Sequence, residues 1–316
     1  MAVSPGLFPH RAVRWHRPLI LFSGAMVALA VVAAVGLVVD DRVLVGAPIW
    51  LKPLKFATSF AVYSATLAWM LSLLPRPSRI AHWAATIIVI TGVIEMVVIV
   101  GQVIRGRQSH FNQLTPLDAR LYDLMAGSIA VLWLGHLAVA GVLARRPLGD
   151  PAVRTAIRLG LVVSVVGMAA TGVPMTLPRG EQIARNTGFV GAHSVGVADG
   201  GPGLPVTGWS TTGGDLRVSH FAALHALQAL PLLAVLLAVV LRARSETTRR
   251  RLVVIGSTGY AGLIGLLLWQ ALRGQPLLRP DGLTLLAGGG LLAGVALAVA
   301  AVLVAARPGV PAVVHR

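Results

Sequence analysis

Long apolar stretches divide the chain into eight segments, each long enough to cross a bilayer as a helix. About 20 apolar residues cover the roughly 30 Å of hydrocarbon, because a helix rises about 1.5 Å per residue. The predicted spans are 18–39, 53–74, 83–104, 116–144, 155–177, 218–241, 252–272 and 283–306. Helices satisfy their backbone hydrogen bonds within one segment, so the pattern predicts an all-α, polytopic integral membrane protein with eight transmembrane helices.

The largest interruption of this pattern is the stretch 179–217, which contains ten glycines. Turn signals stand at 200–203 and 213–214. Long connections of this kind are usually functional or disordered. Apolar residues such as Phe189 and Trp209, with few charges nearby, favour order. We expect an ordered extracytoplasmic lid formed by residues 179–217; a slack linker is the alternative.

The composition agrees with a membrane protein and excludes several kinds of chemistry. Hydrophobic residues make up 56% of the chain and charged residues 12%, with a mean hydropathy of +0.79, whereas soluble domains carry about 25% charge. The absence of cysteine excludes disulfides, thiolate metal sites and thiol catalysis. The net charge of +16 indicates contact with the lipid bilayer and its anionic lipids, and with no nucleic-acid motif present we expect no nucleic-acid partner.

The distribution of basic residues predicts the orientation. With the amino terminus inside, 16 of the 27 lysines and arginines fall on the cytoplasmic side. This predicts a multi-pass protein of the cell membrane with both termini cytoplasmic and the lid outside. The remaining basic residues form a basic outer mouth, whose members at the helix ends are Lys52, Lys55, Arg105, Arg107, Arg217, Arg273 and Arg279.

Short echoes suggest that the chain is built from two similar halves. Lys52 near the start of the second span is echoed by Arg217 near the start of the sixth, and Gln102-x-x-Arg105 is echoed by Gln270-x-x-Arg273, each about 165 residues later. This pattern predicts a 4+4 parallel tandem repeat, with halves 1–150 and 151–316 related by rotation about the membrane normal. Chance similarity between short strings is the alternative.

Polar residues inside the spans are candidates for chemistry, because they are costly there. Glu95 shares one stripe of the third span with Gln102, and His225 precedes Gln228 by one turn in the sixth. Glu95 and His225 lie at similar predicted depth, which suggests a proton-coupled pair. With His220 they form a candidate metal set. Ordinary hydrogen-bonded interior residues are the alternative.

Three further groups complete the list of candidates. His136 lies nearer the cytoplasmic end of its span than His225 does, which disfavours a haem shared by the two rings and favours a structural role. His110 precedes the fourth span, and His193 and Asp199 belong to the lid. These loop residues could contact an outer ligand, or they could only stabilise their loops.

Three functions fit this sequence. We favour binding or transport of a small anionic or amphiphilic ligand at an outward-facing polar site. The alternatives are a membrane oxidoreductase or electron carrier with haem b or a divalent metal, and a non-catalytic assembly subunit. The sequence assigns no catalytic residue and no oligomeric state. The candidate ligand-binding residues are Glu95, Gln102, Arg105, His110, Arg217, His220, His225, Gln228 and Arg273.

Overall fold

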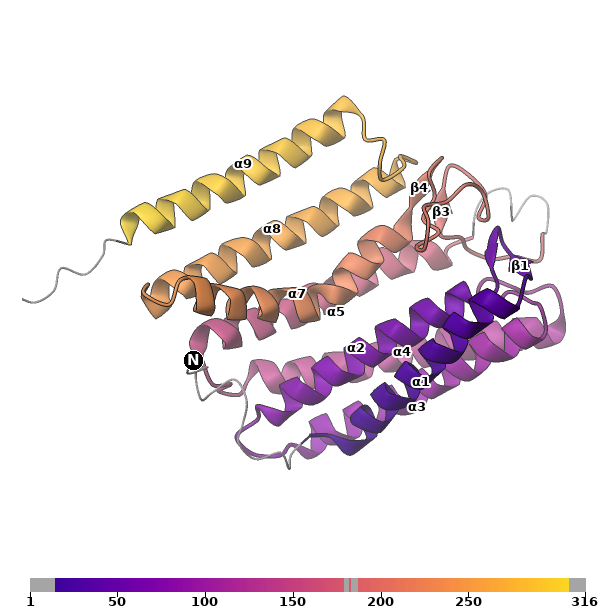
Figure 1. Ribbon diagram of the computed structural model, residues 1–316, viewed down its shortest axis with the longest axis horizontal. Helices are drawn as coiled ribbons and strands as arrows, with labels where there is room; N and C mark the ends of the chain where they lie inside the picture. The colour runs from indigo at the N-terminus through magenta and orange to yellow at the C-terminus, as the bar shows by residue number, and fades with distance from the viewer. Residues whose placement is uncertain (1–14, 179–181, 183–186, 307–316) are drawn as a thin grey trace, which may run out of the picture.

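The computed structural model describes residues 15–178, 182 and 187–306, and within them eight long helices run lengthwise beside one another (Figure 1). The helices are α1 (Arg17–Val39), α2 (Leu51–Ser72), α3 (Arg79–Ile104), α4 (Pro116–Ala144), α5 (Pro151–Thr176), α7 (Leu216–Val240), α8 (Glu246–Leu272) and α9 (Gly282–Ala305). The predicted all-α class is confirmed. Two short two-stranded β-sheets accompany the helices at one end of the array, which we call the lid end.

Several helices begin before the apolar stretch that predicted them, because polar caps start them early. The fifth span was predicted from residue 155, yet α5 starts at residue 151, where the Asp150 side chain accepts from Ala152 N. Likewise α8 starts six residues before its predicted span, after the Ser245 cap. Capping side chains satisfy the free amides of a first turn, so polar residues extend these helices beyond the hydrocarbon. The Thr115 side chain caps α4 in the same way, accepting from Asp118 N.

Seven of the eight helices are long and apolar enough to cross a membrane, so the protein is a multi-pass membrane protein. The exception is α2, which was predicted as a span but is too polar to qualify. Its hydroxyl groups are covered by neighbouring helices: Tyr63 bonds to His136, and Thr66 accepts from Gln228. By contrast, α9 buries only Thr284, and its exposed apolar side chains suit contact with lipid.

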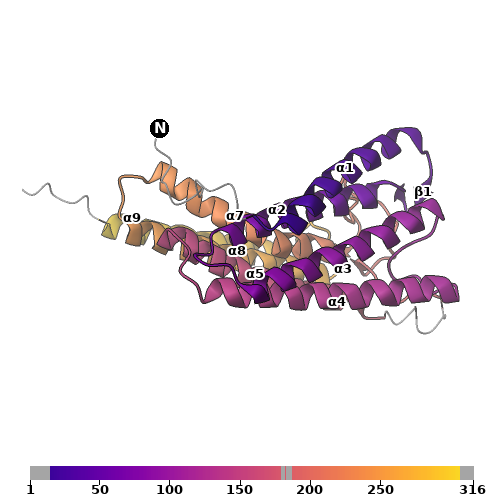
Figure 2. The same ribbon diagram turned by 90° about the horizontal axis from the view of Figure 1, so that it is seen from below.

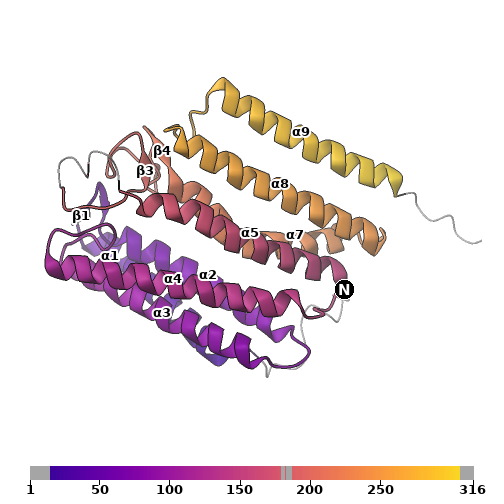
Figure 3. The same ribbon diagram turned by 180° about the vertical axis from the view of Figure 1, so that it is seen from behind.

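The helices pack as two groups. In the α1–α4 group, α1 packs on α2 and α3 on α4, and α3 lies between α1 and α4 in the view of Figure 2. In the α5–α9 group, α7 and α8 pack on α5, and α9 lies against α8. Contacts between α2 and α7 and between α4 and α5 join the groups; the second pair is visible in Figure 3.

The main apolar core crosses the boundary between these groups. It includes Leu67 of α2, Ile88 of α3, Leu143 of α4, Leu161 of α5 and Leu227 of α7, all less than 2% exposed. A core shared by five helices favours a fixed relative position of the two groups. Polar residues that meet at the lid end are therefore held by one packed body.

Residues 187–215 of the lid fold back over the helix ends. Strand β3 (Ser194–Val195) pairs antiparallel with β4 (Gly214–Asp215), beside the hairpin of β1 (Val43–Leu44) and β2 (Ala47–Pro48). Glycines permit this close packing, since a Cβ on Gly214 would collide with the Ala271 carbonyl. The lid backbone consequently rests directly on the end of α8.

Candidate functional site

Three cations meet at the lid end between the two groups. Lys52 and Lys55 lie in the first turn of α2, and Arg217 is the second residue of α7. The charges of Lys55 and Arg217 repel Lys52, while those of Glu95 and Asp199 attract it. Because α2 and α7 contact each other, one cation cluster draws on both groups. We call Lys52, Lys55 and Arg217 the basic cluster.

The members of the basic cluster differ in what they bind. Lys55 Nζ donates to the Thr207 carbonyl of the lid at 2.7 Å. Lys52 Nζ lies 5.8 Å from the centroid of the Phe56 ring, and it makes no hydrogen bond to any residue that the structure describes. An ammonium group has three donors, and Lys52 is the member of the cluster that uses none of them on a described residue.

Arg217 is fixed by the residue that begins its own helix. The buried Asp215 caps α7 and accepts from Arg217 Nε at 2.9 Å and from Arg217 Nη2 at 2.5 Å. Arg217 Nη2 also donates to the Gly208 carbonyl at 2.7 Å. The same aspartate accepts from Ser210 N at 2.8 Å. Asp215 therefore orients Arg217 and attaches the lid to α7.

A histidine–aspartate pair stabilises the lid beside the cluster. Asp199 accepts from the backbone amides of His193 and Ser194 at 3.0 and 2.8 Å, and pairs with His193 Nδ1 at 2.9 Å. Burial alone would raise the pKa of Asp199, but its bonds to His193 hold that pKa well below the usual range. Burial lowers the pKa of His193, whose ring packs 4.9 Å from that of Phe111.

His110 is a further polar group near Lys52. Its ring centroid lies 5.6 Å from that of Phe56, and its Nδ1 lies 3.2 Å from the Ser109 hydroxyl. Burial lowers the pKa of His110 well below its ordinary value, and the charges of Lys52 and His193 add to this effect. His110 is consequently neutral at pH 7 and adds polarity without charge.

Glu95 is fully buried between α3 and α4. Its Oε1 accepts from the Ser128 hydroxyl at 3.0 Å, whereas its Oε2 has no partner among the described residues. Leaving such an oxygen without a partner is costly, because water is excluded from it. The positive charge of Lys52 attracts the ionised form of this carboxyl group.

Other predicted ligand residues belong to a bonded network at the α3–α4 turn. The Asp118 carboxylate accepts from Gln102 Nε2 at 2.9 Å and from Arg105 Nη1 at 2.8 Å. Arg273 makes a comparable pair with Asp281 at the α8–α9 turn, and it also donates to Thr284. These residues join consecutive helices, so their donors are already engaged.

The structure gives the predicted interior residues separate partners. His220 Nδ1 lies 2.9 Å from the Thr171 hydroxyl, and His225 Nδ1 lies 3.2 Å from Gln228 Oε1. Gln228 in turn donates to Thr66 on α2 at 3.0 Å. Neither histidine bonds to Glu95. Across residues 15–178, 182 and 187–306, no three acidic or histidine side chains gather closely enough to hold a metal, including Glu95, His220 and His225.

His136 joins three helices at the middle of the array. Its Nδ1 lies 2.9 Å from the Tyr63 hydroxyl on α2, and its Nε2 lies 3.0 Å from the Ser164 hydroxyl on α5. Both ring nitrogens are engaged, so an iron ligand could form only by displacing one of these partners. This arrangement gives His136 a structural role, and the sequence offered no sign of its two partners.

Comparison with known proteins identifies no relative: no family model, curated protein or solved structure matches this chain. The function is therefore argued from the basic cluster. Lys52 and Lys55 belong to the predicted basic outer mouth but not to the predicted ligand-binding residues. One signal would have singled them out: they are the only two lysines in the chain, three residues apart at the start of a helix.

Proposed function

We propose that this membrane protein binds a small anionic or amphiphilic ligand at its lid end, between α2 and α7. The proposal depends mainly on the surroundings of Lys52. Its ammonium group has no hydrogen-bond acceptor among the described residues, and the charges of Lys55 and Arg217 repel it. Gathering like charges away from bulk water costs energy, and a bound anion offsets that cost. A phosphate or carboxylate would accept from Lys52 while Asp215 and the lid hold Arg217 in place.

Glu95 supports a link between this binding and protons. Lys52 attracts both the Glu95 carboxylate and an incoming anion, so the two negative groups compete for one ammonium. A proton on Glu95 removes the competitor. By linkage, proton uptake at Glu95 and anion binding at Lys52 then favour each other. Proton-driven transport requires such coupling. We therefore extend the proposal from binding of the anion to its transport.

Replacing Lys52 with methionine is expected to weaken anion binding about tenfold or more, because one charge-assisted hydrogen bond is lost. The measurement is titration calorimetry of the purified protein in neutral-lipid nanodiscs, with inorganic phosphate and dodecyl phosphate as probes. Arg107→Gln is the matched control, since it removes an exposed cation from the same end. Glu95→Gln should strengthen binding at neutral pH. Equal affinities for the wild type and Lys52→Met would refute the proposal.

We also propose that residues 1–150 and 151–316 form tandem halves related by rotation about the membrane normal. The second residues of α2 and α7 are both basic, Lys52 and Arg217, and these two helices contact each other. The α3–α4 and α8–α9 turns share further features: a glycine with positive φ follows the arginine in each, Gly106 at 65° and Gly274 at 73°. In each turn the arginine also pairs with an acid of the next helix region. These matches support the repeat.

The orientation that this function requires places the lid outside the cell membrane and both termini in the cytoplasm. Because the chain has no cysteine, a single introduced cysteine reports its own side of the membrane. Thr212→Cys in the lid should react with an impermeant maleimide on intact cells, and Ala243→Cys between α7 and α8 should react only after permeabilisation. Both positions are exposed. The opposite labelling pattern would invert the topology.

A further inference from the structure

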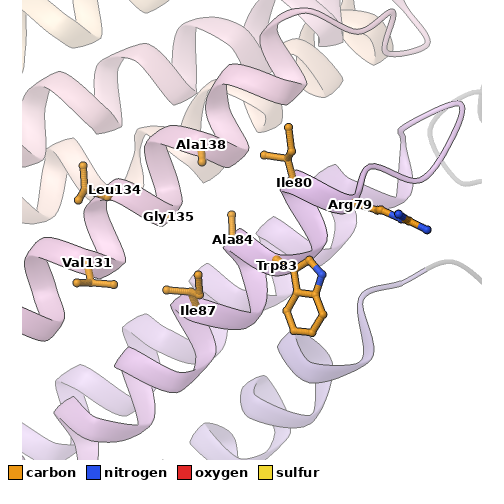
Figure 4. A pocket seen from close by; sticks show the side chains of 9 residues that line it. All are labelled: Arg79, Ile80, Trp83, Ala84, Ile87, Val131, Leu134, Gly135 and Ala138. Carbon is orange, nitrogen blue, oxygen red and sulfur yellow. The ribbon is translucent and has the colours of Figure 1, made fainter.

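An apolar groove of about 520 Å³ runs between α3 and α4 toward the end of the array opposite the lid (Figure 4). Its side chains come from the first three turns of α3 and the second half of α4. The residues that line it are Arg79, Ile80, Trp83, Ala84, Ile87, Val131, Leu134, Gly135 and Ala138. It is unconnected with the basic cluster, which lies at the other end of these helices.

The groove is lined by small residues where α3 and α4 approach closely and by large apolar residues elsewhere. At the base, α3 and α4 approach so closely that a Cβ on Gly135 would lie 3.2 Å from the Ala84 carbonyl oxygen. Trp83 of α3 and Leu134 of α4 also line the groove and are 64% and 56% exposed. A shallow apolar groove of this kind offers a methylene chain an apolar surface to lie against.

Two arginines belong to the ends of α3 and α4 nearest the groove. Arg79 lines its end, and Arg145 follows Ala138 by seven residues, which places it on the same stripe of α4. Arg145 Nη1 is folded back onto the Gly141 carbonyl at 2.9 Å, along that stripe. Neither arginine has an acidic partner within the described part of the chain. Positive charge without a counter-charge therefore borders an apolar groove.

We propose that this groove binds one acyl chain of an anionic phospholipid, whose phosphate is held by Arg79 and Arg145. The lipid comes from the leaflet opposite the lid, which the arginine distribution predicts to be the cytoplasmic one. Charge complementarity selects this occupant, because two unpaired guanidinium groups favour a headgroup with net negative charge over a zwitterionic one. Trp83 stands beside Arg79, where an amphipathic ring suits the membrane interface.

The test is native mass spectrometry of the full-length protein purified with phosphatidylglycerol or phosphatidylcholine of identical acyl chains. We expect phosphatidylglycerol to be retained about tenfold more strongly, and Arg79→Gln combined with Arg145→Gln to abolish the preference. Arg251→Gln, an exposed arginine at the same end on α8, is the matched control and should retain it. Ala138→Phe should fill the groove and reduce retention of both lipids, whereas Ala126→Phe on the exposed surface of α4 should not.

Three results would overturn the proposal. Equal retention of the two lipids by the wild type would show that the headgroup is not recognised. An unchanged preference in the double arginine variant would place the lipid elsewhere. A dimer that forms in neutral lipid and is lost in Ala138→Phe would identify a second copy of the chain as the occupant. Correct folding of each variant is verified by its thermal unfolding profile.

Discussion

Replacing His136 with alanine is expected to lower the free energy of unfolding by about 3 kcal/mol. His136 is fully buried and bonds to Tyr63 of α2 through one ring nitrogen and to Ser164 of α5 through the other. The substitution removes both bonds, leaves the buried Tyr63 hydroxyl without a partner and opens a cavity among three helices; the Ser164 hydroxyl keeps its bond to the Leu161 carbonyl. Because α2 and α5 belong to different groups of helices, the change should loosen the junction of the α1–α4 and α5–α9 groups.

Unfolding in mixed detergent, followed by circular dichroism, measures this effect. His82→Ala is the control, since its ring is exposed near the start of α3 and its loss should change little. Phosphate binding to the folded fraction of His136→Ala should be retained, because the basic cluster lies at the lid end. A variant as stable as the wild type, or one with lost binding and intact stability, would contradict the structural role of His136.

The positions of the helices could be predicted because each membrane-spanning helix requires a continuous apolar run in the sequence. Apolar runs of about 20 residues and caps such as Thr115 are local signals, and both were found in the structure. Helix α2 was predicted as a span but is too polar to qualify as one. Contacts with residues far away in the chain accommodate its polar side chains. The Tyr63 and Thr66 hydroxyls of α2 bond to His136 and Gln228, which lie 73 and 162 residues away in the chain.

The pairing of polar side chains could not be predicted, because depth in the membrane does not specify a neighbour. Glu95 and His225 were assigned the same depth, yet Glu95 bonds to Ser128 and His225 to Gln228. A rotation of one helix by part of a turn changes every partner, and nothing local in the sequence records that rotation. The sequence also did not distinguish the outer arginines: Arg105, Arg273 and Arg217 each pair with an acid near their own helix end, and Arg217 in addition belongs to the basic cluster.

Asp215→Asn is expected to destabilise the protein by about 3 kcal/mol and to free the lid from α7. Asparagine caps a helix as well as aspartate does, so the cap itself is kept. What is lost is the negative charge beside Arg217, whose side chain is only 22% exposed and which then lacks a counter-charge. One asparagine oxygen also cannot replace two carboxylate oxygens that accept from Ser210 N and from three donors of Arg217.

Asp281→Asn provides the matched comparison, because Asp281 also caps a helix and also pairs with an arginine, Arg273. That pair is exposed, with Asp281 41% accessible, so solvent screening should leave the substitution nearly neutral. Thermal unfolding and limited proteolysis of the lid measure both variants. We expect Asp215→Asn alone to melt earlier and to be cleaved faster between residues 187 and 215. Equal behaviour of the two variants would show that burial of the Asp215–Arg217 pair does not hold the lid, and that the other lid contacts suffice.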